Sequence, residues 1–196
     1  MSLDWSARYL TGETPWDKGE PHPELPFLLS EHRKIFAEAG SIFVPGCGLG
    51  HDAALIREVA LGTIVALDIA PEAIKKAKAL YPDLSIDWRV DDLFVQQGCF
   101  DVVFEHTCFC AIPIERRGEY ADLMGRLIPQ GSCLVGIFFP DPDHEGEDGP
   151  PFGIELDELH RFFEDRFELE WSQQPQKTYE SRAGDGRELC MVWRRK

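Results

Sequence analysis

A glycine-rich segment between an apolar run and a helical pattern is the first place where the residues could do chemistry. Residues 44–52 read Val-Pro-Gly-Cys-Gly-Leu-Gly-His-Asp, and Asp68 ends the next apolar run, 20 residues after Gly48. Glycines let a backbone approach a ligand closely, and a helix that follows them offers free N–H groups. A carboxylate at the next strand end can accept both hydroxyls of an adenosine ribose. The pattern predicts a nucleoside-type ligand held by Gly46, Cys47, Gly48, Asp68 and Ile69.

The spacing of the glycines narrows the ligand further. Dinucleotide sites carry the pattern GxGxxG, whereas this loop reads GxGxG and has His51 where the third glycine would stand. The missing pyrophosphate-binding glycine favours S-adenosylmethionine, which has no phosphates, over NAD. After the third expected strand, Asp92 can accept a hydrogen bond from the adenine amino group, with Leu93 against the ring. The alternative for this loop is a tight turn with a helix cap and no ligand.

The elements that must position these residues alternate along the chain. We expect strands over 41–44, 63–67, 85–90, 100–104 and 132–139, with helices over 27–39, 51–60, 71–80, 114–127 and 155–163. Residues 167–171 and 188–193 look like a closing pair of strands. Strands that alternate with helices form a parallel sheet covered on both faces. The sequence therefore predicts an α/β fold, a three-layer Rossmann-like sandwich whose mostly parallel seven-stranded sheet has an antiparallel edge strand.

Length and charge limit the possible partners. The 196 residues suit a single domain over 1–196, and 35 acidic against 20 basic side chains give a net charge of −15. The sequence contains no stripe of basic residues that could bind the phosphates of a nucleic acid, and no apolar run is long enough for a membrane helix. The six cysteines form no CxxC pair, and His144 and His160 lack companion acids at ligand spacing. We expect a cytoplasmic monomer that acts on a small molecule, without nucleic acid, membrane or metal.

Four segments together resemble the class I methyltransferases that use S-adenosylmethionine, and more narrowly the thiopurine methyltransferase family with its thiol/halide branch. The resemblance runs from about Trp5 to Glu188, nearly the whole chain. The four segments that carry it are Gly-Glu-Thr-Pro-Trp-Asp-Lys-Gly at 12–19, the loop at 44–52, Phe-Glu-His-Thr-Cys-Phe-Cys-Ala-Ile at 104–112, and Asp-His-Glu-Gly at 143–146 with Gly-Pro-Pro-Phe at 149–152. The combination is specific, although each segment alone is a weak signal.

The resemblance implies roles for further residues. It makes residues 1–26 a lid over the cofactor, in which Trp5, Tyr9 and Trp16 contact S-adenosylmethionine, and aromatic faces do attract a sulfonium cation. It places His106 at the rim of the active site, where plant relatives carry tyrosine, and in contact with the cofactor. Arg117 aligns with an arginine that thiopurine enzymes place near the substrate. The alternatives are ordinary packing for the aromatics and for His106, and a solvated helix position for Arg117.

The reaction that the resemblance implies is in-line displacement of a methyl group, with S-adenosylhomocysteine as the product. A thiolate or halide needs no strong base, and positioning two reactants can supply on the order of 7–11 kcal/mol. His106 can take the proton of a neutral thiol, and Asp17 can orient the acceptor or a water from the lid. Three alternatives stay open: methyl transfer to oxygen or nitrogen, S-adenosylmethionine binding by a non-catalytic regulator, and a nicotinamide-dependent oxidoreductase. The glycine spacing counts against the last of these.

Overall fold

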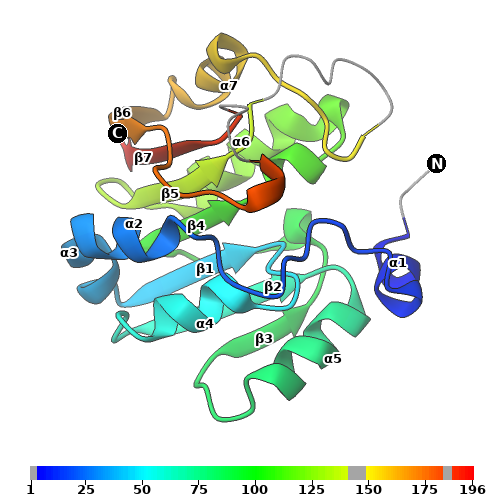
Figure 1. The fold of residues 1–196 in the computed structure, drawn as a ribbon. Helices are drawn as coiled ribbons and strands as arrows, with labels where there is room; N and C mark the ends of the chain where they lie inside the picture. The colour runs from blue at the N-terminus through cyan, green and yellow to red at the C-terminus, as the bar shows by residue number, and fades with distance from the viewer. Residues whose placement is uncertain (1–3, 141–148, 183–186) are drawn as a thin grey trace. The chain divides into compact units, whose positions relative to one another are not determined.

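The computed structural model describes residues 4–140, 149–182 and 187–196, and the chain divides into two compact units, 1–96 and 97–196 (Figure 1). The prediction of a single domain over 1–196 concerns how the two units join, and it stays a prediction.

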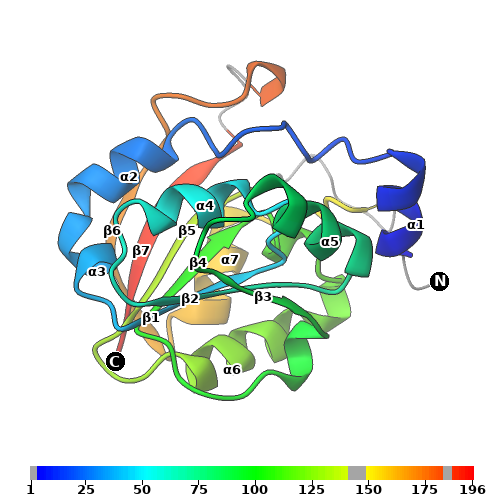
Figure 2. The same cartoon turned by 90° about the horizontal axis from the view of Figure 1, so that it is seen from below.

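The first unit is built around three parallel strands. They are β1 (Ser41–Pro45), β2 (Thr63–Asp68) and β3 (Asp87–Val90), with Ser41 opposite Thr63 and Val65 opposite Asp87. The helices α4 (His51–Arg57) and α5 (Pro71–Leu80) connect the strands and cover one face of them (Figure 2). Because parallel strands end at the same edge of a sheet, the residues that follow β1, β2 and β3 come together there.

The N-terminal part of this unit is more helical than the sequence suggested. Residues 5–11 form α1 (Trp5–Thr11), in which the Asp4 side chain accepts from the backbone N–H of Ala7 at 3.0 Å and Gly12 ends the helix at φ 79°. The single helix expected over 27–39 is divided into α2 (Leu25–Glu31) and α3 (Arg33–Ala37). The division falls at His32, whose φ of −104° and ψ of 31° lie outside the helical region.

The second unit adds the remaining four strands. β4 (Val102–His106) runs parallel to β5 (Cys133–Phe138), and β7 (Leu189–Arg195) lies antiparallel between β5 and β6 (Phe167–Gln173). The helices α6 (Arg117–Leu127) and α7 (Leu156–Phe163) pack side by side. Short 3-10 turns occur at η2 (Phe109–Ala111), η3 (Ile114–Arg116) and η5 (Glu180–Arg182), so the helix expected from 114 is regular only from Arg117.

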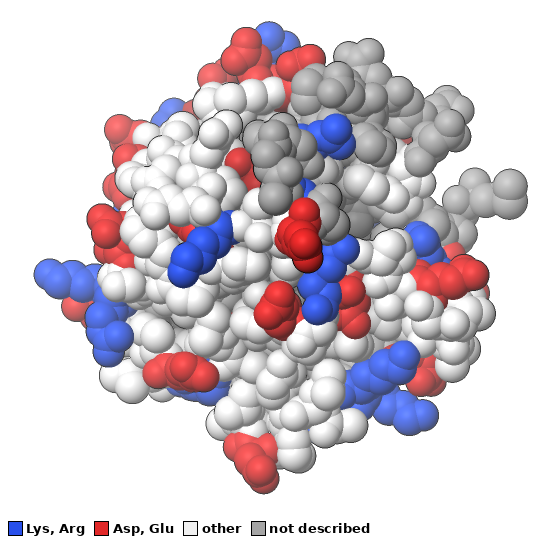
Figure 3. Space-filling view, in the orientation of Figure 1, with Lys and Arg blue, Asp and Glu red and all other residues white. Residues whose placement is uncertain are grey.

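The hydrogen-bonded strand order is β3-β2-β1 within the first unit and β4-β5-β7-β6 within the second. This confirms the predicted α/β class with seven strands, mostly parallel, and the closing antiparallel pair. Among the described helices, none has the length and the apolar character needed to cross a membrane. Acidic and basic side chains are interspersed among uncharged ones on the face drawn in Figure 3.

Candidate active site

The loop after β1 takes a conformation that depends on its glycines. Gly46, Gly48 and Gly50 have φ values of 58°, 55° and 79°, a region that side chains disfavour. The backbone N–H of Cys47 donates to the carbonyl of Leu67 at 2.9 Å, which ties the loop to the end of β2. Gly50 then becomes the N-cap of α4. The loop therefore lies beside the last residues of β2, as the βαβ pattern predicted.

Asp68 holds this loop through its carboxylate. It is 7% exposed, and its two oxygens accept from the backbone N–H groups of Gly48 and Ala70, each at 2.9 Å. Burial raises the pKa of this carboxyl, and the backbone N–H groups of Ala70, Gly48 and Ile69 partly offset the rise. An ionised carboxylate has about four acceptor positions. The side chain therefore keeps acceptor capacity for a ribose hydroxyl.

The three aromatic residues of the N-terminal segment form one cluster. The rings of Trp5 and Trp16 meet edge to face at 5.2 Å, and the Trp16 indole N–H donates to the hydroxyl of Tyr9 at 3.1 Å. The cluster packs on Ala70, Ala73 and Leu49. A Cβ on Gly48 would lie 3.1 Å from the Tyr9 hydroxyl. The structure thus brings the predicted aromatics against the glycine loop.

Other predicted residues of the first unit are already engaged. The carboxylate of Asp17 accepts from the N–H of Gly19 at 2.9 Å and lies 3.3 Å from Nε2 of His51, whose Nδ1 shares a 2.6 Å hydrogen bond with the Tyr81 hydroxyl. Asp17 therefore lies beside His51, the first residue of α4. This contact favours a role in holding the N-terminal segment in place over a role in binding the acceptor. The carboxylate of Asp92 accepts from the N–H of Phe94 at 2.9 Å.

The hydrogen bond from the Phe94 N–H to Asp92 caps the short turn η1 (Leu93–Val95), and the second carboxylate oxygen of Asp92 can accept from a ligand. Leu93 is buried, whereas Ile69, next to Asp68, is 53% exposed. An exposed apolar side chain beside Asp68 can pack on a flat ring. The contacts predicted for Leu93 and Ile69 with an adenosine stay predictions.

The residues at this edge fit S-adenosylmethionine. Three aromatic rings suit a sulfonium cation, which aromatic faces attract. The carboxylate of Asp68 keeps acceptor capacity, and the loop beside it is held in the left-handed conformation that its three glycines allow. The residues that would hold the cofactor in the first unit are Trp5, Tyr9, Trp16, Gly46, Cys47, Gly48, Asp68, Ile69, Asp92 and Leu93.

Two predicted residues belong to the second unit. His106 ends β4, and its ring stacks on that of Tyr179 with centroids 6.2 Å apart and planes 17° apart. Arg117 is 1% exposed and donates to the carbonyls of Gly153 at 2.9 Å and Phe152 at 2.7 Å. The interpretation of Arg117 as a solvated helix residue is therefore wrong, and burial lowers the pKa of its guanidinium.

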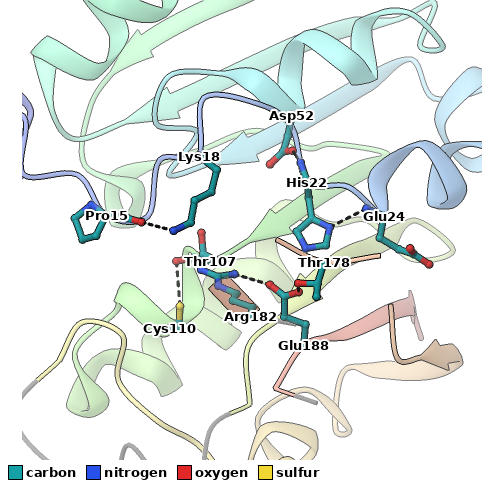
Figure 4. A network of polar contacts seen from close by, with 10 residues as sticks. All are labelled: Pro15, Lys18, His22, Glu24, Asp52, Thr107, Cys110, Thr178, Arg182 and Glu188. Carbon is teal, nitrogen blue, oxygen red and sulfur yellow. Dashed lines mark hydrogen bonds and ion pairs between the residues drawn. The ribbon is translucent and has the colours of Figure 1, made fainter. Parts of the chain in front are cut away.

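Sequence reasoning missed a polar cluster in the second unit. Glu188 is 3% exposed and accepts from the Thr178 hydroxyl and from Arg182, at 2.5 Å for the arginine (Figure 4). It missed as well the buried Glu105, which stands inside the apolar strand β4. An acid within an apolar run was the available signal for Glu105, because such residues are almost never buried without partners. The segment 143–146, with His144, lies outside the described residues.

The fold has a Rossmann-like α/β architecture. The N-methyltransferase NodS from Bradyrhizobium japonicum, solved with S-adenosyl-L-homocysteine, superposes with a TM-score of 0.74 at 14% identity. The match covers 96% of this chain and 95% of that one. At this identity the likeness shows the fold, and it confirms the expected Rossmann-like class.

The chain belongs to the thiopurine S-methyltransferase family, whose model matches residues 2–194. A probable thiol methyltransferase 2 from Arabidopsis thaliana is 29% identical over 172 residues, which cover 80% of this chain and 70% of that protein. Thiocyanate methyltransferase 1 from Brassica oleracea is 31% identical over 166 residues, 76% of this chain and 66% of the relative. The chain thus spans about two thirds of the length of these relatives. Membership in this family confirms the prediction that the protein is an S-adenosylmethionine-dependent methyltransferase.

Proposed function

We propose that this chain transfers the methyl group of S-adenosylmethionine to a small sulfur nucleophile, such as a thiol, hydrosulfide or thiocyanate, with halide as a further acceptor. The observation that carries the proposal is the similarity to proteins named thiol and thiocyanate methyltransferases over about four fifths of the chain. Acceptors of this kind are nucleophilic as anions. For such acceptors the protein must align the two reactants and exclude water, and it does not need a strong base.

The N-terminal aromatics and Asp68 would hold the methyl donor. When bound, S-adenosylmethionine supplies a methyl group activated by its sulfonium. The rings of Trp5, Tyr9 and Trp16 would stabilise that positive charge, an effect of roughly 0.5–2 kcal/mol per ring contact. Asp68 would fix the ribose by accepting from its hydroxyls. The segment 1–26 would act as a lid that keeps water from the donor.

His106 is the proposed acceptor-side residue. A neutral thiol must lose its proton during the reaction, and an imidazole can accept a proton near neutral pH. A thiocyanate or halide carries no such proton, so His106 would then serve as a contact and not as a base. The two acceptor types therefore separate these roles of His106. For Arg117 and Asp17 the observed contacts support roles in holding the site, and not in the chemical step.

The assay measures S-adenosylhomocysteine formed by the purified protein with thiocyanate, hydrosulfide, an aromatic thiol and iodide, beside a phenol and an amine. Turnover with the sulfur acceptors at least tenfold above that with the phenol and the amine supports the proposal. Preference for either of those two would favour the alternative acceptors. Binding of S-adenosylhomocysteine in calorimetry without turnover of any acceptor would favour a regulator.

Variants of two aspartates test the donor site. Asp68→Ala should weaken S-adenosylhomocysteine binding at least tenfold, because the ribose contact and the support of Gly48 are both lost. Asp87→Ala is the matched control, since Asp87 is an exposed residue of β3 that pairs with Arg89. The control should bind like the wild type. Equal affinities for all three proteins would contradict the proposed place of the ribose.

We propose further that the protein is a cytoplasmic monomer. None of the six cysteines forms a disulfide, and Cys108, Cys110, Cys133 and Cys190 are buried. Reduced thiols suit a reducing compartment. Sedimentation of the purified protein tests the oligomeric state.

A further inference from the structure

The turn after β4 contains a backbone conformation that side chains rarely adopt. Thr107 has a φ of 59°, and among the described residues it is the one non-glycine residue with positive φ. A β-branched residue in this region is a genuine outlier, and such outliers cluster at functional sites. Thr107 directly follows His106, at the carboxyl end of a parallel strand, where α/β folds bind their ligands. The outlier therefore indicates a functional role for the turn after β4.

Glu105 supplies the hydrogen bonds that hold this turn. Its side chain is 1% exposed, and Oε1 accepts from the N–H groups of Cys108 at 3.0 Å and Phe109 at 3.1 Å. Oε2 accepts from the Tyr120 hydroxyl at 2.8 Å and from the N–H of Phe109 at 3.2 Å. The Cys110 thiol donates to the carbonyl of Thr107 at 3.3 Å (Figure 4). These bonds hold the carbonyl of Thr107 and the two N–H groups that follow it.

Packing leaves this carboxylate little freedom. Gly136 lies opposite Glu105 on β5, and a Cβ there would come within 2.8 Å of the Glu105 carbonyl oxygen. The ring of Phe109, at the other end of the turn, meets the rings of Tyr120 at 5.3 Å and Phe163 at 5.8 Å. Hydrogen bonds and packing therefore determine the same conformation, which is the condition under which a strained residue persists.

We infer that Glu105 is a positioning residue for the methyl acceptor: its carboxylate keeps Thr107 in the left-handed region, and the turn so formed directs His106 to the acceptor. The inference rests on the proposed function, which assigns the acceptor side to His106. His106 stands between Glu105 and Thr107 in the chain, so the direction of its ring follows from the backbone that these two residues hold.

A graded set of variants tests the role of the carboxylate. Glu105→Gln keeps one acceptor oxygen for the N–H groups of Cys108 and Phe109, and its amide can donate to Tyr120. We expect less than a threefold rise in KM for thiocyanate. Glu105→Ala removes every contact, and we expect at least a tenfold rise in KM. Because the donor is bound by the first unit, the Kd for S-adenosylhomocysteine should stay within twofold for both variants.

Two further variants separate positioning from loss of stability. Leu127→Ala creates a cavity at a buried position of α6, and it should lower the thermal midpoint without changing KM. Thr107→Gly removes the backbone strain, so the midpoint should stay or rise, while the freer turn raises KM at least threefold. If Glu105→Ala does not fold, Glu105→Gln and Thr107→Gly still decide the question. A KM that follows only the midpoint across the set would overturn the inference.

A spectroscopic readout distinguishes failure of this inference from failure of the proposed function. The nuclear Overhauser contact between the stacked rings of His106 and Tyr179 should be present in the wild type and in Leu127→Ala, and absent in Glu105→Ala. If the wild type methylates no sulfur acceptor, the proposed function fails, and the ring contact alone decides whether Glu105 positions His106. An unchanged ring contact in a folded Glu105→Ala protein would refute the inference.

Discussion

Two glycines with nearly the same backbone conformation allow a controlled test of the glycine loop. Gly50, the N-cap of α4, has φ 79° and ψ 15°, and Gly12, the C-cap of α1, has φ 79° and ψ 12°. A Cβ on Gly50 would lie 2.3 Å from the Trp88 ring, whereas a Cβ on Gly12 meets nothing within 4 Å. Alanine at each position pays the same conformational cost, and at Gly50 alone it also collides with a ring.

The two costs have different sizes. The left-handed region costs an alanine roughly 1–2 kcal/mol, which is the whole effect expected for Gly12→Ala. Overpacking adds about 1–3 kcal/mol, so Gly50→Ala should lose roughly 2–5 kcal/mol of unfolding free energy. Relief of the collision is hindered because the Trp88 ring stacks on Tyr81, with centroids 6.4 Å apart, and the Tyr81 hydroxyl bonds His51.

The collision in Gly50→Ala should also weaken binding at the donor site. Displacement of the start of α4 moves the loop from Gly46 to Gly50, so we expect Gly50→Ala to bind S-adenosylhomocysteine at least tenfold more weakly, about 1.4 kcal/mol. Gly12→Ala should bind within about threefold of the wild type. Urea unfolding measures the stabilities and calorimetry the affinities. Equal stability losses in the two variants would refute the reasoning, because the Trp88 contact would then have no consequence.

Three further predictions concern the second unit. Arg117→Met removes two hydrogen bonds from a buried guanidinium to the carbonyls of residues 152 and 153, and each bond contributes about 1.5–3 kcal/mol. Urea unfolding should therefore show a loss of at least about 2 kcal/mol in unfolding free energy. A loss below about 1 kcal/mol would contradict a stabilising role of these two bonds. In the native protein at pH 8, iodoacetamide should modify the exposed Cys99 and spare Cys110, because burial raises the pKa of the Cys110 thiol to about 12; mass spectrometry that found Cys110 alkylated as fast as Cys99 would count against this. Burial also raises the pKa of the Glu105 carboxyl in the folded state, so this group favours folding below its unfolded pKa and loses that contribution as pH rises through the folded value. The stability of the wild type minus that of Glu105→Gln should therefore fall between pH 4.5 and pH 8, and a difference that rises over this range would show the opposite shift.

Much of the fold could be predicted from the chain because its signals are local. The apolar runs that became β1, β2, β4 and β5 are buried strands, and a proline at the first position of α5 marked the start of that helix. The boundaries were less accurate where local and tertiary preferences compete. The apolar pattern of residues 27–39 is that of one helix, yet the backbone of His32 divides it. The helix at Trp5–Thr11 was not predicted, although Asp4 and Gly12 carry its capping signals.

The sequence by itself indicated the class of site, because a glycine loop and an acid at this separation on consecutive strands of a βαβ unit are typical of a nucleoside site. Only the tertiary structure decided what the polar residues away from that pattern do. Asp17 lies beside His51, Arg117 binds two carbonyls, and Glu105 holds the turn that follows His106. The partner of Asp17 lies 34 positions away, and those of Arg117 lie 35 and 36 positions away. The N–H groups that Glu105 binds lie only three and four positions away, across the turn at Thr107. Burial and partner choice depend on how distant segments pack, and a spacing rule along one chain does not contain that information.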